Sequence, residues 1–330
     1  MIYLDNSAHH PILQCVKQKI YETVPLLCNP SSSYSCGRNL RSQIENSRKI
    51  VADFINCDAD EIVFTSGATE SNAIAMNTFP NDTISFYEHD GLRLNPKAKI
   101  NEAPDMIMLV NNEVGENYTD FIMNNPIVYS DTTAAMGNIT VDVKTLDLKM
   151  AGFSAEKLGA LSGCGVLYVK NCVSINPIIY GHQEKGCRGG TENTLGIIAL
   201  GEAIKYAKSH IEEKYKHCEI IKQTLLDELT KTGIDFIVNG NNTIPQICSV
   251  SFKGVEGEGI GLWLDKYGIC VAHGSACNSG NLEPSKVLQA MNIPKNYING
   301  TIRFSFNLEN TIDEIKYVVE KINEFVKMVT

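Results

Sequence analysis

The chain has 330 residues, of which 43% are hydrophobic and 20% are charged, and its formal net charge at pH 7 is −9. This length predicts about two domains with a sizeable core, and no apolar run reaches the roughly 18 residues that a membrane span needs. The negative charge argues against nucleic-acid binding through a general basic surface, which leaves small molecules and other proteins as the expected partners.

The cysteines and the first residues together indicate a cytoplasmic protein. Eleven cysteines are spread from Cys15 to Cys277 without a CxxC pair or a zinc-type spacing, so we predict no metal site and expect most thiols to be reduced and buried. Residues 1–5 carry no basic segment of the kind that opens a secretory signal.

Two histidines, His9 and His10, stand between a short extended segment and a helix that we predict over 11–27. Adjacent side chains diverge, and no third metal ligand is evident in the sequence. A role in the turn or at a pocket edge is therefore favoured over a metal pair. A loop at 29–33 and a helix over 37–55 follow.

A strand predicted at 61–64 runs into the small and hydroxyl residues of 65–71, which precede an apolar helix around 73–76. The backbone N–H groups and hydroxyls of such a turn can bind a phosphate at the helix N-terminus. A helix capped by its own side chains is an equally supported alternative.

Three further predicted strands, at 83–87, 106–110 and 127–130, each end close to polar side chains. In an open α/β sheet the carboxyl ends of successive strands share one crevice. We therefore expect the residues that follow these strands to converge there with Thr69 and Lys157; they are His89, Asn112 and Asp131.

Lys157 lies in a small-residue turn between strands predicted at 146–153 and 166–169. A lysine that is partly buried between strands loses its charge more easily, so its amine can attack an aldehyde and form a Schiff base. Taken alone, a solvated loop lysine is the simpler interpretation.

The C-terminal third changes pattern after a long helical stretch at 191–233. Strands at 247–252 and 301–305 and a helix at 257–267 predict a smaller α+β unit. The glycines of 254–261 have the wrong spacing for a dinucleotide loop and are interpreted as a helix start.

Three details complete this C-terminal unit. The last strand places Arg303 and Ser305 on one face, and Thr311 opens a capping box for the final helix. Cys277 lies in a small, polar loop, a setting that suits a nucleophilic thiol better than a core residue.

These motifs resemble those of the cysteine desulfurases, which are class V, fold-type I pyridoxal-phosphate enzymes. The resemblance covers nearly the whole chain, and the motifs follow one another in the family's order. The segments that carry the resemblance are 3–6 (YLDN), 29–32 (NPSS), 64–71 (FTSGATES), 88–89 (EH), 110–115 (VNNEVG), 188–191 (RGGT), 274–277 (GSAC) and 282–285 (LEPS).

The resemblance implies an α/β fold of the fold-type I transferases, with a mainly parallel sheet in the large domain and a smaller α+β domain. The domains are expected at 1–15 (an N-terminal segment at the active-site edge), 16–233 (the cofactor-binding domain with its bridging helix) and 234–330 (the small domain that carries the cysteine loop).

The resemblance also implies the cofactor pyridoxal 5'-phosphate and a role for each matching residue. Lys157 would hold the cofactor as a Schiff base, Asp131 would pair with its ring nitrogen, and His89 would stack on the ring and move protons. The remaining expected contacts are Ala68, Thr69 and Ser154 with the phosphate, Thr191 with the phosphate of the partner subunit, Asn112 with the ring hydroxyl and substrate, and Asn6 and Arg303 with the substrate.

Cys277 would take the sulfur of L-cysteine as a persulfide and leave L-alanine. The long loop around it, 274–283, resembles the branch of the family whose cysteine delivers sulfur to acceptor proteins, for iron–sulfur cluster assembly or tRNA thiolation. The resemblance further implies a homodimer.

The sequence departs from the family pattern in its pocket. Glu156 stands where a histidine usually donates to the cofactor phosphate, and a carboxylate about 4 Å from a phosphate costs several kcal/mol at an effective dielectric of about 20. Glu156 should therefore turn away, be protonated or pair with a cation. Ala134 replaces a glutamine, Tyr34 replaces a histidine, and His9 and His10 replace hydroxyl residues.

A shortened segment at 77–130 completes the departures. Two alternatives follow from them. One is a related lyase or aminotransferase such as selenocysteine lyase, which would keep Lys157 and Asp131 without depending on Cys277. The other is a catalytically degenerate scaffold.

Overall fold

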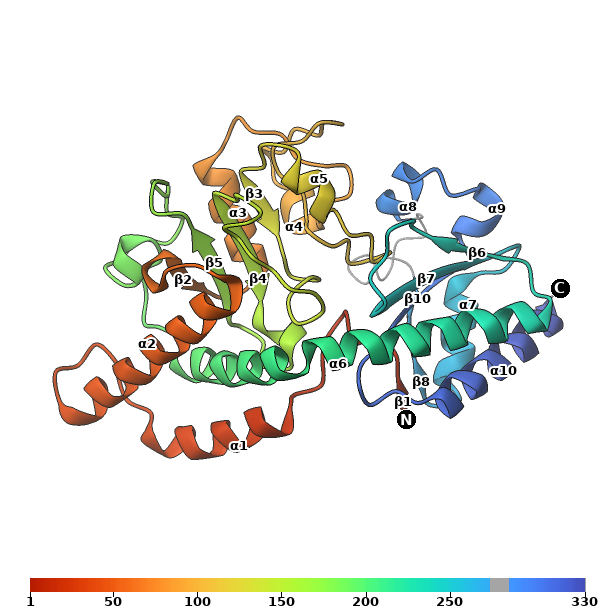
Figure 1. Ribbon diagram of the computed structural model, residues 1–330, viewed down its shortest axis with the longest axis horizontal. Coiled ribbons are helices and arrows are strands. Elements are labelled where there is room, and N and C mark those ends of the chain that lie inside the picture. Colours follow the sequence, from red (N-terminus) through yellow and green to blue (C-terminus); the bar gives the residue numbers. More distant parts are fainter. Residues whose placement is uncertain (274–284, 330) are drawn as a thin grey trace. The chain divides into compact units, whose positions relative to one another are not determined.

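The computed structural model describes residues 1–273 and 285–329, which form two compact units (Figure 1). The larger unit comprises His10–Val110 and Tyr118–Ile211, and the smaller unit comprises Met1–His9, Asn111–Asn117 and Glu212–Thr330. Helix α6 (Thr194–Thr232) belongs to the larger unit up to residue 211 and to the smaller unit beyond it.

A four-stranded sheet forms the centre of the larger unit, in the order β2 (Ile62–Thr65), β5 (Gly165–Val169), β4 (Met150–Ser154) and β3 (Tyr129–Asp131). Strand β5 is antiparallel to both of its neighbours, and β3 is parallel to β4. All of these strands except β5 therefore run in the same direction. The mainly parallel sheet predicted for this part of the chain is confirmed.

Two predicted strands of this sheet are reduced to single parallel bridges beyond β3. Met106 pairs with Tyr129, and Ile84 pairs with Met106. The prediction of full strands at 83–87 and 106–110 was wrong: backbone hydrogen bonds join 105–109 to β3, but neither segment forms a regular strand. The strand predicted at 146–153 begins only at Met150, since a turn with Asp147 at a φ of 48° precedes it.

Two helices of the larger unit place many buried side chains in its core. In α2 (Ser35–Ile55) the buried side chains Leu40, Ile44, Val51 and Ile55 recur at helical spacing. Helix α3 (Ala68–Thr78) packs against β4, and its buried Ile74, Ala75 and Met76 join the core of the sheet. The shorter elements are α1 (Gln14–Thr23), η1 (Val24–Leu26), η2 (Ala59–Glu61), α4 (Asp90–Arg93), α5 (Thr119–Met123), η3 (Ala155–Leu158) and η4 (Glu184–Gly186).

The smaller unit is built on an antiparallel sheet in the order β6 (Phe236–Asn239), β7 (Ile247–Phe252), β10 (Thr301–Ser305) and β9 (Ala272–His273). At the N-terminus, β1 (Ile2–Tyr3) pairs in parallel with β8 (Ile269–Cys270). The helices are α7 (Gly257–Asp265), α8 (Lys286–Ala290), α9 (Lys295–Ile298) and α10 (Ile312–Val329).

The core of this unit joins residues from both ends of the chain, since Leu4 belongs to the same cluster as Phe304 and Phe306. The capping box of α10 is present: Thr311 N–H donates to Glu314, and Glu314 N–H donates to the Thr311 hydroxyl. Within the described residues, every helix is too short or too polar to cross a membrane.

Candidate active site

Lys157 lies in η3, directly after β4, and the turn ends at Gly159, whose φ of 78° is left-handed. Its Nζ is 3.8 Å from Oε1 of Glu156, and the two side chains are 25% and 19% exposed. Of the three outcomes expected for Glu156, pairing with a cation is the one that the structure contains. The cation is the candidate catalytic lysine itself.

The N-terminal segment of the larger unit holds this lysine turn in place. His10 N–H donates to the Glu156 carbonyl (3.3 Å), and Leu13 N–H donates to the Gly159 carbonyl (3.1 Å). A Cβ added to Gly159 would lie 2.9 Å from Nδ1 of His10. His10 is buried, and its Nδ1 lies 2.7 Å from the Pro11 carbonyl, which favours the turn role over the metal pair.

The residues predicted to bind a phosphate meet where α3 begins. Gly67, the cap residue, has no side chain to offer, and the N–H of Ala68 donates instead to Oγ of Ser154 at the end of β4 (2.8 Å). The alternative of a helix capped by its own side chain is therefore wrong. Since a helix leaves about four N–H groups without intrahelical partners, this start retains the character of an anion site.

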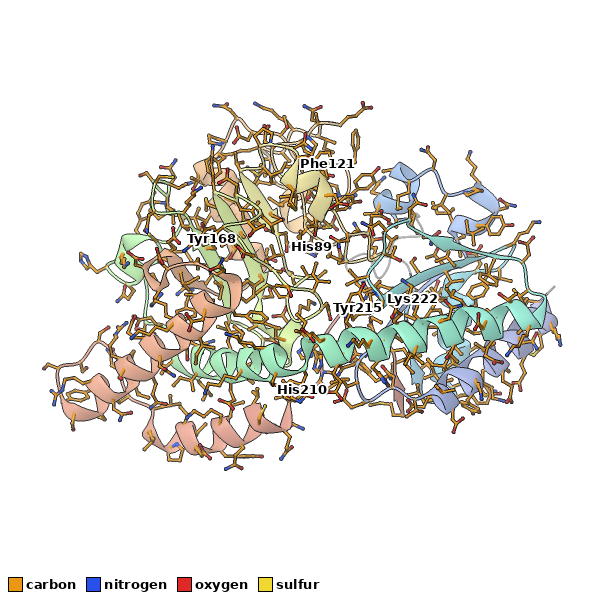
Figure 2. All side chains as sticks on the ribbon, in the orientation of Figure 1. His89, Phe121, Tyr168, His210, Tyr215 and Lys222 are labelled. Atoms are coloured by element: carbon orange, nitrogen blue, oxygen red, sulfur yellow. The ribbon has the colours of Figure 1, made fainter. Side chains whose placement is uncertain are left out.

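His89, labelled in Figure 2, caps α4. Its Nδ1 accepts a hydrogen bond from Gly91 N–H (3.0 Å), which places the proton of a neutral ring on Nε2. A Cβ added to Gly91 would lie 3.1 Å from Nδ1 of His89, 3.3 Å from Nδ2 of Asn72 and 3.6 Å from Cγ2 of Thr69. Three side chains thus surround one glycine.

Asp131 ends β3 as a buried carboxylate with two donors. Asn72 Nδ2 donates to its Oδ2 (3.0 Å), and Thr133 N–H donates to its Oδ1 (3.0 Å). Asn72 accepts in turn from the hydroxyl of Tyr129. Sequence reasoning missed Asn72, although its position one helical turn after Thr69 places both on one side of α3.

Glu88 is a second buried acid in this region, and its Oε1 accepts from Met108 N–H (2.5 Å). Burial raises its pKa well above the ordinary value, and the nearby charge of Asp131 raises it further. Both effects favour the protonated form of Glu88, and its Oε2 has no hydrogen-bond partner among the described residues.

The predicted substrate-binding residues belong to the smaller unit, where they lie together. Arg303 donates from Nη1 to the Asn112 carbonyl (2.8 Å) and from Nη2 to Asp5 (2.8 Å). Its buried Nε has no partner in the part of the chain that the structure describes. The amide of Asn6 donates to the carbonyl of Ser305 (2.8 Å), on the same strand as Arg303.

The contacts above do not include Thr191. Thr191 is exposed and lines a small cavity of about 90 Å³ with Arg188 and Asn193. Cys277 and its loop lie outside the described residues. Within the larger unit, Thr69 and His89 lie close to Asn72, which is bonded to Asp131, and Ala68 is bonded to Ser154. Convergence of these residues with Lys157 on one crevice stays a prediction, and Asn112 belongs to the other unit.

A larger cavity of about 600 Å³ lies elsewhere in the larger unit and contains none of the predicted site residues. Its walls include a buried ion pair, in which Nη1 and Nη2 of Arg48 each lie 2.8 Å from a carboxylate oxygen of Glu184. Glu192 also lines it, and its Oε1 pairs with Arg41 (2.7 Å).

The residues of the larger unit fit pyridoxal 5'-phosphate. The helix start and Ser154 suit a phosphate, the buried Asp131 suits a protonated ring nitrogen, and Lys157 follows Ser154 by three residues. The hydroxyl of Thr133, beside Asp131, is buried without a hydrogen-bond partner among the described residues and can take one from a bound group. Glu156 is the feature that fits the phosphate least.

A family model described as Aminotransferase class-V matches residues 2–90 and 106–318. A protein of Dictyoglomus turgidum named cysteine desulfurase IscS is 32% identical over 378 aligned residues, which cover 99% of this chain and 94% of that protein. A cysteine desulfurase of a Nostoc species is 34% identical, with 99% and 93% covered.

Solved structures are also similar to this chain. A NifS-like protein from Rickettsia africae has a TM-score of 0.88 at 26% identity, with 99% of each chain covered. The apo cysteine desulfurase of Thermococcus onnurineus, at 22% identity and with 99% of this chain and 95% of that chain covered, has a TM-score of 0.84 and supports the fold. The family model leaves residues 91–105 unmatched, and these residues lie inside the segment expected to be shortened.

Proposed function

The chain belongs to the class-V aminotransferase family and is one of its cysteine desulfurases, and on that premise we propose that it converts L-cysteine to L-alanine with the sulfur held as a persulfide on Cys277. The reaction balances without an external oxidant: L-cysteine and the Cys277 thiol give L-alanine and the Cys277 persulfide. The observation that carries the proposal is the grouping of Ala68, Ser154 and Lys157 at the end of β4.

Pyridoxal 5'-phosphate, when bound, supplies an electron sink for the negative charge that develops on the substrate. We propose that Lys157 holds it covalently, that the start of α3 and Ser154 bind its phosphate, and that Asp131 keeps a negative charge beside its ring nitrogen. Asn72 and Thr133 support that role because each donates a hydrogen bond to Asp131.

We assign proton movement to Nε2 of His89. Its other nitrogen already accepts from Gly91, so Nε2 is the atom that can carry and release a proton. The short helix α4 that His89 caps fixes the ring by this bond.

Arg303 is proposed to bind the carboxylate of L-cysteine. A carboxylate can approach the guanidinium along its Nε and Nη2 edge, where Nε has no partner among the described residues and Nη2 is held by Asp5. Substrate would then take the place of Asp5 on Nη2. The contact of Nη1 with the Asn112 carbonyl would keep the side chain aligned.

The test is the visible absorption spectrum of the purified protein with added pyridoxal 5'-phosphate, before and after L-cysteine. We expect a band that the Lys157→Ala variant lacks and that L-cysteine changes. Cys277→Ala should keep the band and lose alanine production. Unchanged alanine production in Cys277→Ala would refute the persulfide step, and a comparison of selenocysteine with cysteine turnover in that variant would identify a selenocysteine lyase.

The remaining parts of the proposal concern partners and location. We propose a homodimer in which Thr191 serves the partner subunit's cofactor, a sulfur-acceptor protein for iron–sulfur cluster assembly or tRNA thiolation, and a cytoplasmic location. Light scattering on the purified protein tests the homodimer. Transfer of radioactive sulfur from the enzyme to candidate proteins tests the acceptor, and cell fractionation tests the location.

A further inference from the structure

Two cysteines outside the candidate active site flank the loop that joins η1 to α2. Cys28 follows η1, and Cys36 lies in the first turn of α2. Both are free thiols; Cys36 is exposed and Cys28 is half-buried. The segment between them contains the NPSS sequence at 29–32.

The loop folds back onto the start of α2, so its two ends meet. Ser32 N–H donates to the Asn29 carbonyl (3.2 Å), and Arg38 donates to the Ser33 carbonyl. A Cβ added to Gly37 would lie 2.5 Å from the Ser32 carbonyl oxygen and 2.9 Å from the Asn29 carbonyl oxygen. The residue after Cys28 is therefore packed directly against the residue after Cys36.

The packing of Asn29 against Gly37 brings the two thiols near each other. Burial raises the pKa of the Cys28 thiol, and its hydrogen bond with the Cys36 thiol raises it further. The exposed Cys36 is therefore the thiol that reacts first with a reagent from solution. The half-buried Cys28 can then attack the mixed disulfide formed on Cys36.

We propose that Cys28 and Cys36 form a redox-active dithiol, which closes to an intramolecular disulfide by exchange with a small-molecule disulfide. The Cys36 thiolate attacks one sulfur of the reagent, forms a mixed disulfide and releases one thiolate. The Cys28 thiolate then attacks Sγ of Cys36 and releases the second. The protein loses two electrons and two protons, and the reagent is reduced to two thiols.

The position of this dithiol links it to the RGGT segment. Nη2 of Arg41 lies 3.4 Å from Oγ of Ser31 in the loop and 2.7 Å from Oε1 of Glu192, the residue after Thr191. A closed disulfide would restrain the loop at both ends. Through the contact with Ser31, it would also restrain the position of the Arg41 side chain.

The test uses the full-length protein in mixtures of reduced and oxidised glutathione, followed by alkylation, trypsin digestion and mass spectrometry. Both cysteines fall on one tryptic peptide, 20–38, so closure appears as the loss of two hydrogens from that peptide. The peptide 171–185 carries the exposed Cys172 as its only cysteine and reports simple accessibility. We expect peptide 20–38 to close without retaining glutathione under conditions in which Cys172 carries a glutathione adduct.

Two variants separate the roles of the thiols. Cys28→Ser should trap glutathione on Cys36, whereas Cys36→Ser should acquire much less adduct on Cys28. The proposal is overturned if peptide 20–38 of the unsubstituted protein stays reduced while Cys172 reacts, if it keeps glutathione on both cysteines, or if a non-reducing gel shows that the bond links two chains.

Discussion

The Nζ of Lys157 lies 3.8 Å from Oε1 of Glu156, the residue immediately before it in the chain. In the family pattern described above, a histidine usually stands at that place. A carboxylate therefore lies beside the amine that is proposed to hold the cofactor.

Replacing Glu156 by glutamine should speed cofactor loading. Loss of the carboxylate removes a negative charge that repels the incoming phosphate, and charge interactions of partly exposed groups are worth about two- to five-fold. The rate at which the lysine-dependent visible band appears after addition of pyridoxal 5'-phosphate measures this. Glu156→Asp keeps the charge and serves as the control; equal rates in all three proteins would contradict the prediction.

The acid Glu88 should make stability depend on pH. Its pKa is raised above the ordinary value of 4.5, so the folded state binds its proton more tightly than the unfolded state. The stabilisation is full below pH 4.5 and is lost as pH rises through the folded pKa, by at most about 1.4 kcal/mol per pH unit.

Glu88→Gln should flatten this dependence above pH 4.5, because its amide stays neutral throughout. Urea unfolding at several pH values gives the slope. Glu102→Gln, on an exposed segment, is the matched control and should follow the unsubstituted protein. A slope that Glu88→Gln leaves unaltered would assign the pH dependence to other groups.

The buried pair of Arg48 and Glu184 should show strong coupling. Arg48→Met leaves a carboxylate that is 2% exposed without its cation, at a cost of about 3–5 kcal/mol in the free energy of unfolding. Adding Glu184→Gln should recover part of that loss, since the buried charge is then absent as well. Strictly additive losses in a double-mutant cycle would argue against the coupling.

Asn72→Leu should weaken cofactor retention. It removes the hydrogen bond to the Asp131 carboxylate, and bonds to charged groups contribute about 1.5–3 kcal/mol, which corresponds to a rise in the cofactor Kd of roughly 10- to 150-fold. Fluorescence titration measures the Kd. Asn77→Leu, on the same helix with its amide bonded to Asn176, should leave the Kd near that of the unsubstituted protein.

Elements with a strong local pattern could be predicted from the sequence. Strands β7 (Ile247–Phe252) and β10 (Thr301–Ser305) match their predicted bounds, because β-branched and aromatic runs between turn residues carry their own signal. The long helix α6 and the capping box at Thr311 were likewise predictable from local residues.

Features that depend on distant partners could not be predicted in this way. Met106 and Ile84 take part only in single bridges, which the apolar runs around them do not reveal. The segment Asn111–Asn117 joins the smaller unit although the residues on either side belong to the larger one. The pairing of Glu156 with Lys157 was one of three outcomes, and side-chain geometry decided among them.

Strand β1 has consequences for how the chain is made. The carbonyl of Leu4 accepts a hydrogen bond from the N–H of Ser305, 301 residues later, and Ile2 pairs with Ile269. At a synthesis rate of about 5–20 residues per second, these first residues wait roughly 15 to 60 s for their partners. During that interval Ile2 and Leu4 face solvent or a chaperone, and the smaller unit closes only after Ser305 has been synthesised.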